Sequence, residues 1–283
     1  MIKIDIKKRL HGSHGDMNLE VAIEIKQNEF LSLSGMSGSG KTTFLRVLAG
    51  LEDAIGTIEV DKQIWKNERI NLAPQKREIG FVFQDYALFS NMSVKENLLY
   101  VKNDNKLAKR LLEITELDNL IDRLPNSLSG GQKQRVSLCR AMMNNPKLLL
   151  MDEPLSSLDF TMRQKLQNVI LMLHKEFGTT TIMVSHDPSE IYKLSSRVII
   201  LNQGKVISDG TPKEILLKTK GSQKFSFEGE LLEIKKVDVI YIAIVAIGQQ
   251  LVEIVISSEE KKDLKIGQIV KIGTKAFSPT ISY

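Results

Sequence analysis

A glycine-rich segment near the start of the chain could bind phosphates. Residues 35–42 read Gly-Met-Ser-Gly-Ser-Gly-Lys-Thr and satisfy the pattern G-x-x-x-x-G-K-[ST], between an expected strand and an expected helix at residues 43–49. Glycines let the backbone wrap around phosphates, while successive N–H groups and the helix N-terminus face the negative charge. Lys41 adds a cation, and the Thr42 hydroxyl can ligate Mg²⁺. The residues expected to bind a nucleotide are Gly35, Met36, Ser37, Gly38, Ser39, Gly40, Lys41, Thr42 and Thr43.

Two adjacent carboxylates could supply the rest of a hydrolysis site. Asp152 and Glu153 directly follow the apolar run at residues 148–151, and ligands gather at the carboxyl ends of strands in parallel sheets. Asp152 would hold Mg²⁺ while Glu153 would polarise the attacking water, which is what hydrolysis of a terminal phosphate requires. The alternative is a pair of solvated carboxylates that merely follows a strand.

Strands and helices must alternate to position these groups. Polar or glycine-rich residues, and in several cases a helical pattern, follow each short apolar run, which favours an α/β fold with a mostly parallel core sheet. After Asp159, apolar residues three or four apart predict a helix that Gly178 ends. On this helix we expect Met172 to fill the core and His174 to be solvated. The runs typical of buried strands are residues 30–33, 81–83, 148–151 and 180–184.

Two changes in composition divide the chain. Residues 92–127 are rich in Leu, Lys, Glu and Asn, which indicates a helical insertion. Beyond residues 219–222, segments rich in Ile and Val and punctuated by glycines predict a small β-domain. We expect a nucleotide-binding domain at residues 1–222, with a helical subdomain at about 90–145, and an all-β domain at residues 223–283.

The bulk properties constrain the setting. The 283 residues are 42% hydrophobic and 26% charged, and the formal net charge of +5 suits polyphosphate, nucleic acid or an anionic membrane surface alike. The single cysteine, Cys139, excludes an internal disulfide and is expected to be buried rather than reactive. The most apolar late run, residues 239–247, is less than half of the roughly 20 residues that a membrane helix needs. We therefore expect any membrane role to require a partner that spans the bilayer.

The segment Leu-Ser-Gly-Gly-Gln at residues 128–132 resembles the signature of the nucleotide-binding subunits of ABC transporters. Ser129 and the glycines precede an expected helix at residues 132–143, so they offer a second helix N-terminus for phosphate; the alternative is an ordinary N-capped helix. The resemblance covers roughly residues 1–220 and implies a P-loop NTPase of the ABC ATPase type that binds ATP with Mg²⁺. It also implies a homodimer packed head to tail, in which one chain's signature closes over its partner's ATP through Ser129, Gly130, Gly131 and Gln132.

Three further residues match this family in chain order. Gln84 matches the Q-loop glutamine, which in the family approaches Mg²⁺ and links hydrolysis to a membrane partner. Asp159 ends a match to the D-loop at the dimer interface, and His186 matches the switch histidine near the γ-phosphate. The resemblance implies catalytic roles for Glu153, His186 and Gln84, metal roles for Thr42, Gln84 and Asp152, and a nucleotide site that includes Asp159.

The chain departs from the family where adenine would stack. The family usually places an aromatic residue upstream of the phosphate loop, whereas residues 10–17 contain no Phe, Tyr or Trp. His11 or His14 could stack on the base, or Met17 could pack against it. The alternative is that the two histidines lie on the surface of a turn.

The C-terminal β-domain resembles the TOBE or Mop-type appendage of importer ATPases, on cues at residues 229–231, 264–270 and 275–277. Residues 75–85 and 122–125 look like molybdate-importer ATPases, so the resemblance implies import of molybdate or tungstate, with sulfate, polyamine, iron or sugar as alternatives. The appendage would either bind the oxyanion and slow transport or only stabilise a dimer.

An importer ATPase would lie peripherally on the cytoplasmic face of the cell membrane, bound to integral membrane permease subunits and, through them, to a solute-binding protein. We expect residues 84–91 and the helical insertion to form the docking surface for the permease, with Phe89, Met92 and Val94 as exposed apolar residues.

Two rival classes fit the sequence less well. ABC-type ATPases that act on nucleic acid usually insert a long coiled coil between the phosphate loop and the signature, but fewer than about ninety residues separate Thr42 from Leu128 and they carry no sustained heptads. We therefore expect no nucleic-acid partner. An inactive binding module would lack catalytic groups, whereas Lys41, Glu153 and His186 are all present.

Overall fold

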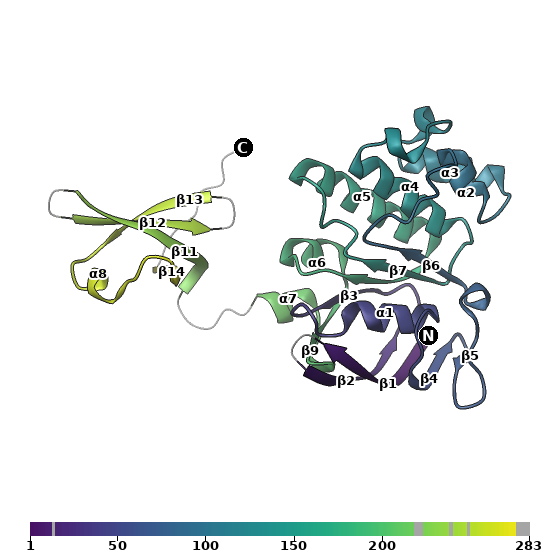
Figure 1. Cartoon of the computed structure of the whole chain (residues 1–283), viewed down its shortest axis with the longest axis horizontal. Coiled ribbons are helices and arrows are strands. Elements are labelled where there is room, and N and C mark those ends of the chain that lie inside the picture. Colours follow the sequence, from purple (N-terminus) through teal and green to yellow (C-terminus); the bar gives the residue numbers. More distant parts are fainter. Residues whose placement is uncertain (13–14, 218–222, 238–239, 248–249, 276–283) are drawn as a thin grey trace. The chain divides into compact units, whose positions relative to one another are not determined.

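The computed structural model describes residues 1–12, 15–217, 223–237, 240–247 and 250–275 (Figure 1). The chain divides into two compact units, Met1–Leu217 and Lys218–Tyr283. Each unit has its own sheet, so each is described by itself. His14 lies outside the described residues, as do residues 276–277 of the expected appendage.

A ten-stranded mixed sheet forms the centre of the first unit, in the order β5-β4-β1-β2-β10-β9-β3-β8-β7-β6. Strands β9, β3, β8, β7 and β6 pair in parallel, whereas β1 pairs antiparallel with β2 and β4. The expected α/β fold with a parallel core is therefore confirmed, and an antiparallel layer extends it. The strands are β1 (Ile2–Gly12), β2 (Gly15–Ile25), β3 (Phe30–Ser34), β4 (Ile55–Val60), β5 (Gln63–Lys66), β6 (Ile79–Val82), β7 (Leu148–Asp152), β8 (Thr180–Val184), β9 (Arg197–Asn202) and β10 (Lys205–Gly210).

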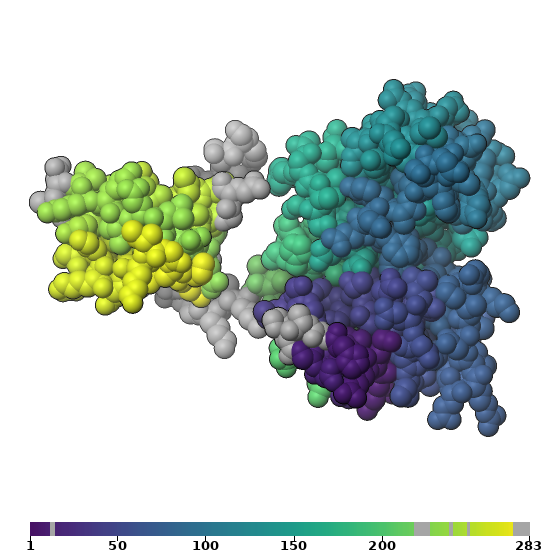
Figure 2. Space-filling model, viewed as in Figure 1, coloured from purple at the N-terminus to yellow at the C-terminus, as the bar shows by residue number. Residues whose placement is uncertain are grey.

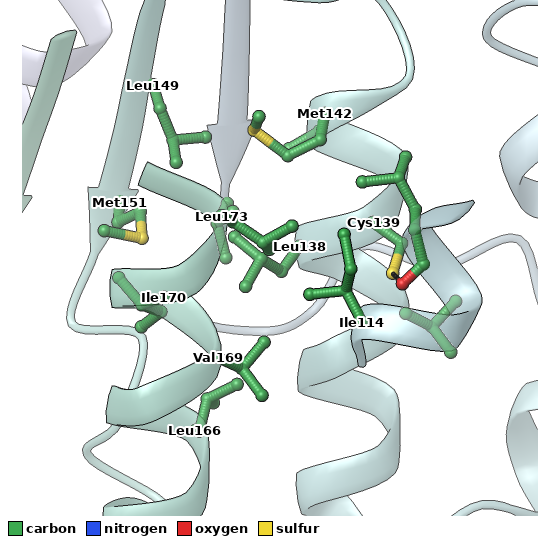
Figure 3. Packing of buried hydrophobic residues seen from close by; sticks show 14 of the residues in the cluster. Ile114, Leu138, Cys139, Met142, Leu149, Met151, Leu166, Val169, Ile170 and Leu173 are labelled. Carbon is green, nitrogen blue, oxygen red and sulfur yellow. Dashed lines mark hydrogen bonds between the residues drawn. The ribbon is translucent and has the colours of Figure 1, made fainter. Parts of the chain in front are cut away.

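Helices cover this sheet and enclose two apolar cores. Because side chains alternate along a strand, β7 sends Leu148 and Leu150 into the core beneath the first helix and Leu149 and Met151 into the core beneath the other helices. Figure 3 shows the second core, where strand residues meet side chains of α4 and α5. The helices are α1 (Lys41–Ala49), α2 (Val94–Leu99), α3 (Asn105–Ile114), α4 (Gly130–Met142), α5 (Phe160–Phe177), α6 (Pro188–Leu194) and α7 (Pro212–Leu216).

Residues 83–147, all of them described, contain helices and no strand. Helices α2 and α3 and the short 3₁₀ turns Asp118–Leu120 and Pro125–Ser127 make up the insertion that precedes α4. Figure 2 shows these helices (blue to teal) and the N-terminal strands (purple) on opposite sides of the first unit. No helix in the described part of the chain is long and apolar enough to cross a membrane.

Three expectations about burial are wrong. Met172 is 49% exposed, because it lies one residue before the buried Leu173 and faces away from the sheet. His174 is not solvated: the loop after Gly178 folds β8 back beside it, so its Nδ1 lies 3.0 Å from Thr181 Oγ1. Burial lowers the pKa of His174 below its ordinary value. Val94, the first residue of α2, is fully buried rather than exposed.

Cys139 is buried in α4, as expected, and its thiol lies against Thr115 Oγ1 at 3.1 Å. Burial raises the pKa of this thiol to about 12. The thiol therefore stays protonated and unreactive at neutral pH.

The second unit is an antiparallel four-stranded sheet in the order β13-β12-β11-β14. Among its described residues, only Leu231, Ala243 and Val245 are fully enclosed apolar side chains, so its core is small. Its elements are β11 (Gln223–Val237), β12 (Ile240–Ile247), β13 (Gln250–Ile256), the four-residue helix α8 (Glu260–Asp263) and β14 (Ile269–Lys275).

Candidate functional site

The glycine-rich loop connects β3 to α1. Gly35 has a φ of 144°, and a Cβ there would lie 2.0 Å from the carbonyl oxygen of Leu201, so no other residue fits. Gly40 has a φ of 97° and begins α1 without any side-chain hydrogen bond to the helix N-terminus. The first N–H groups of α1 are therefore available to an anion.

Lys41 is held across this loop. Its side chain donates from Nζ to the carbonyl oxygens of Gly35 and Met36, each at 2.8 Å. Burial lowers the pKa of Lys41, although the carboxylates of Glu153 and Asp152 nearby oppose the shift. The ammonium group is thus already positioned over the loop, where it faces two carboxylates.

Thr42 and Asp152 meet across the site. The Thr42 hydroxyl donates to Asp152 Oδ1 at 3.2 Å, and Asp152 is only 8% exposed. Burial raises the pKa of Asp152 above its ordinary value, and the Thr42 hydrogen bond partly offsets this rise. A hydroxyl and a carboxylate at the end of a parallel strand are hard oxygen donors, which fits Mg²⁺.

Glu153 has an unusual backbone. Its φ of 47° lies in the left-handed region, which non-glycine residues rarely adopt, and its N–H donates to the Val184 carbonyl oxygen at 3.2 Å. The His186 Nδ1 lies 3.5 Å from Glu153 Oε1. The left-handed turn aims the carboxylate of Glu153 toward His186 instead of along the strand.

A single cavity of about 670 Å³ joins these groups. It brings together the phosphate loop, the acidic pair, Gln84 and His186, as the sequence predicted for their positions. Leu10, which sequence reasoning did not single out, lines its upper part with His11 and Met17. The lining residues are Leu10, His11, Met17, Gly35, Ser37, Gly38, Gly40, Lys41, Thr42, Thr43, Gln84, Asp152, Glu153 and His186.

His11 is fixed at the rim of this cavity. Its Nδ1 lies 2.6 Å from Asp16 Oδ1, across the β1–β2 pair. Of the candidates for adenine contact, His11 and Met17 line the cavity together with Leu10, whereas His14 lies outside the described residues.

Met36 and Ser39 do not line the cavity with their side chains. Met36 is 77% exposed, whereas Ser39 is buried and its Oγ has no hydrogen-bond partner among the described residues. Their backbone still shapes the loop, because the Met36 carbonyl accepts from Lys41 and from the Ser39 N–H.

The signature lies outside this cavity. Ser129 caps α4, which begins at Gly130, two residues before the expected start at residue 132, and the Ser129 Oγ accepts from the Gln132 N–H at 3.4 Å. The Gln132 Oε1 in turn accepts from the Ser129 N–H at 2.8 Å. Gly130 and Gly131 form the first turn between them. This reciprocal arrangement is a capping box.

Asp159 also acts as a helix cap. Its Oδ1 accepts from the Met162 N–H at 2.9 Å at the start of α5. Tyr86, just after Gln84, lies 3.0 Å from Ser157 Oγ through its hydroxyl. The D-loop match is thus tied to the Gln84 segment, but Asp159 does not line the nucleotide cavity of its own chain.

Sequence reasoning missed a polar cluster behind His186. Arg163, Ser185, Asp187 and Glu190 surround the segment that carries His186. Their signal in the sequence was weak, because Arg163 and Asp187 are 24 residues apart and come from two different elements.

Residues 19–156 match the family model described as ABC transporter. Together with the mixed sheet and the phosphate loop, this match defines the first unit as an ABC ATPase fold of the P-loop NTPase class.

Two curated proteins with similar sequences are ATP-binding proteins of import systems. The chain is 42% identical over 222 residues to the sulfate/thiosulfate import ATP-binding protein CysA 2 of Agrobacterium fabrum, covering 75% of this chain and 64% of that protein. It is 39% identical over 219 residues to the spermidine/putrescine import ATP-binding protein PotA of Clostridium novyi, covering 74% and 62%. The chain therefore carries an ABC transporter ATPase domain similar to the ATP-binding proteins of these two import systems, and it spans less than two thirds of the length of these two relatives.

Solved structures agree with this fold. The dimeric, post-hydrolysis structure of the ATP-binding cassette MJ0796 with ADP and Pi has a TM-score of 0.64 at 29% identity, over 75% of this chain and 99% of that one. The cbiO1 protein of Clostridium perfringens, part of the ABC transporter complex cbiONQ, has a TM-score of 0.67 at 27% identity, over 77% and 90%.

Proposed function

We propose that this chain binds ATP with Mg²⁺ and hydrolyses it to drive import of a small solute through membrane permease subunits. The observation that carries the proposal is the single cavity in which the phosphate loop meets Asp152, Glu153 and His186. The import-system relatives supply the transport context.

The residues divide the work of hydrolysis. The N-terminus of α1 and Lys41 hold the β- and γ-phosphates. Thr42, Gln84 and Asp152 would hold Mg²⁺, whose chemistry is to neutralise charge on the phosphate oxygens. In the described residues, no group of three or more His, Cys, Asp or Glu side chains is arranged for a metal.

Glu153 would act as the general base. Its carboxylate accepts a proton from the attacking water, and the left-handed turn keeps it at the mouth of the cavity. His186, 3.5 Å away, would donate a hydrogen bond to the γ-phosphate. Gln84, two residues after β6, also lines the cavity.

A second copy of the chain would complete the site. Ser129 and Asp159 face away from the cavity of their own chain and cap helices instead. A head-to-tail homodimer would bring the signature of one copy over the ATP of the other, and the MJ0796 relative is a dimer. Dimerisation would therefore be required for turnover but not for the first contact with nucleotide.

For the transported solute we propose only a chemical class. The relatives named above import sulfate/thiosulfate or spermidine/putrescine, both of which were alternatives to molybdate in the sequence analysis. We infer a small charged solute, either an oxyanion or a polyamine. The prediction of molybdate or tungstate stays a prediction.

The second unit would serve as the TOBE or Mop-like appendage. Its cavity of about 440 Å³ is lined mainly by apolar side chains, with Glu260, Asp263 and Lys271 as its charged residues. Two carboxylates and one ammonium group disfavour an oxyanion, so a role in stabilising a dimer is better supported. Calorimetry of the full chain with molybdate should show no heat of binding at this unit.

The permease would dock on the helical insertion, at the cytoplasmic face of the membrane. Phe89 packs edge-on against Tyr100, which is 65% exposed, beside a surface cavity of about 490 Å³ that Met92 and Leu99 also line. An exposed aromatic pair next to a groove of mixed apolar and charged residues fits a protein interface. Tyr100→Glu should reduce co-purification with the permease subunits without changing basal hydrolysis.

Phosphate release by the full chain tests the proposed reaction. Glu153→Gln keeps the shape of the side chain but removes the base, so turnover should fall about 10²- to 10⁴-fold while ATP still binds. Glu68→Gln, an exposed acid outside the cavity, is the matched control. Sedimentation with ATP should show dimers of the Glu153→Gln chain. Wild-type turnover in that variant, or no nucleotide binding by the native chain, would contradict the proposal.

A further inference from the structure

A polar cluster encloses the segment that carries His186. Ser185 Oγ donates to Glu190 Oε2 at 2.6 Å, and the Asp187 N–H donates to Ser185 Oγ at 3.1 Å. Asp187 also caps α6, because its Oδ1 accepts from the N–H groups of Ser189 and Glu190. The residues on both sides of His186 are thus fixed, although the His186 side chain itself is 67% exposed.

Arg163 is the cation of this cluster. It lies in the first turn of α5, and its Nη1 donates to Asp187 Oδ2 at 2.9 Å. Its Nε lies 3.5 Å from Glu190 Oε1, whose side chain is only 6% exposed. Burial raises the pKa of Glu190, and the hydrogen bond from Ser185 opposes that rise. Arg163 is therefore the counter-ion of a buried carboxylate.

The same guanidinium also reaches the D-loop match. Its Nη2 donates to the carbonyl oxygen of Leu158 at 3.3 Å, directly before the helix cap Asp159. A cavity of about 40 Å³ is lined by this cluster together with Glu153 and His186. One side chain thus connects the segment that follows Glu153 with the segment that carries His186.

We propose that Arg163 is a positioning residue for hydrolysis, which holds residues 156–159 and the His186 segment in fixed register so that His186 faces Glu153. The inference rests on the proposed function of this cavity. The role favours arginine, because its planar fork hydrogen-bonds Asp187 and Leu158 in different directions and places its charge beside Glu190, whereas lysine offers one point charge.

Arg163→Gln tests the proposal when compared with Arg110→Gln. Arg110 forms a similar pair with Glu176, with Nε and Oε1 2.8 Å apart, but on the outer surface of α3 and α5. In the nucleotide-free chain, Arg163→Gln should raise amide hydrogen exchange at residues 184–190 at least tenfold. It should lower kcat at least tenfold while the Kd for ATP stays within twofold. Arg110→Gln should change none of the three.

Two further variants separate positioning from general stability. Arg163→Lys should recover part of kcat and part of the exchange protection, because it restores the charge without the fork. Glu190→Gln, which keeps the acceptor for Ser185, should raise exchange in the same segment even if Arg163→Gln fails to fold.

Unchanged exchange at residues 184–190 in both Arg163→Gln and Glu190→Gln would overturn the inference. So would a kcat within twofold of wild type, or a loss of kcat matched by an equal weakening of ATP binding. If the native chain hydrolyses no ATP, the proposed function fails by itself, while the exchange comparison still decides whether Arg163 orders the His186 segment.

Discussion

The N-termini of α1 and α4 both lie in glycine-rich motifs, yet they differ in whether a side chain caps their first N–H groups. At α1, Gly40 provides no side chain, so the first N–H groups stay open at the cavity. At α4, Ser129 and Gln132 satisfy each other's backbone N–H groups in a capping box. The first terminus has no side-chain cap, whereas the second is capped by its own side chains.

This difference indicates an order of events. A single chain can offer α1 to phosphates at once, because no hydrogen bond must be broken first. At the α4 terminus, Ser129 Oγ already accepts from the Gln132 N–H, but its hydroxyl proton can still be donated to a phosphate oxygen. The γ-phosphate of a partner's ATP would provide that acceptor once a second copy binds. Substitutions at the α1 terminus should therefore weaken ATP binding, whereas substitutions at the α4 terminus should slow hydrolysis.

Lys41→Ala should give the largest change. Loss of a charge-assisted contact to phosphate is worth about 3 kcal/mol, so the Kd for ATP should rise about 100-fold. Titration with a fluorescent ATP analogue measures this, with Lys109→Ala on the exposed face of α3 as the control. ATP affinity within a factor of three of wild type would show that α1 does not hold the phosphates.

Ser129→Ala should separate the two termini. ATP binding to a single chain should stay within twofold, whereas turnover should fall about tenfold, because one hydrogen bond to a phosphate oxygen is lost. Phosphate release at saturating ATP is the measurement. Ser93→Ala removes the equivalent capping serine of α2 and should leave turnover unchanged. Equal losses in the two variants would mean that only helix capping matters.

Gln132→Ala should have a smaller effect, mainly on folding. It removes one half of the box at α4, so the free energy of unfolding should drop by about 0.5 to 1 kcal/mol, or Tm by about 2 °C. Glu96→Ala removes the matching half at α2 and should give a similar shift. Calorimetry decides: no shift in Gln132→Ala would show that the box at α4 does not form.

Cys139 of the native chain should not react with thiol reagents near neutral pH. It lies buried further along α4, and burial raises its thiol pKa to about 12, so a thiol reagent at pH 8 should not modify the native chain but should modify it fully in denaturant. Rapid labelling of the native chain would reveal that α4 opens in the absence of a partner.

The same thiol should lower the free energy of unfolding as the pH rises into the alkaline range. The folded chain holds the thiol proton more tightly than a free thiol, whose ordinary pKa is 9.0. The contribution of Cys139 to the free energy of unfolding is therefore present below pH 9 and is lost as the pH rises through about 12. Denaturant titrations of Cys139→Ala should be flatter over that range than those of wild type.

The sequence predicted the parallel core and the cavity because both depend on local signals. Each buried strand is a short apolar run, and the glycine and acidic motifs sit at strand ends where parallel topology must gather them. Burial at single positions was harder. His174 looked solvated, since periodicity along α5 says nothing about Thr181 folding back against it.

Contacts between distant segments left no readable pattern. Arg163, Asp187 and Glu190 are each ordinary charged residues in amphipathic stretches, and only the packing of α5 beside α6 brings them together. The N-capped start of α4 was within reach of the sequence, because Ser-x-x-Gln is a known start signal, and an N-capped helix was the alternative given for residues 128–132.

Because Leu201 lies in β9, the phosphate loop gains the support at Gly35 only late in synthesis of the first unit. The carbonyl of Leu201 fills the space above Gly35, and Gly204 donates from its N–H to the Ser39 carbonyl oxygen at 3.2 Å. A nascent chain that ends before β9 lacks this support, although its loop has long left the ribosome. Competence for nucleotide should thus be acquired only when the last strands of the first unit emerge and dock.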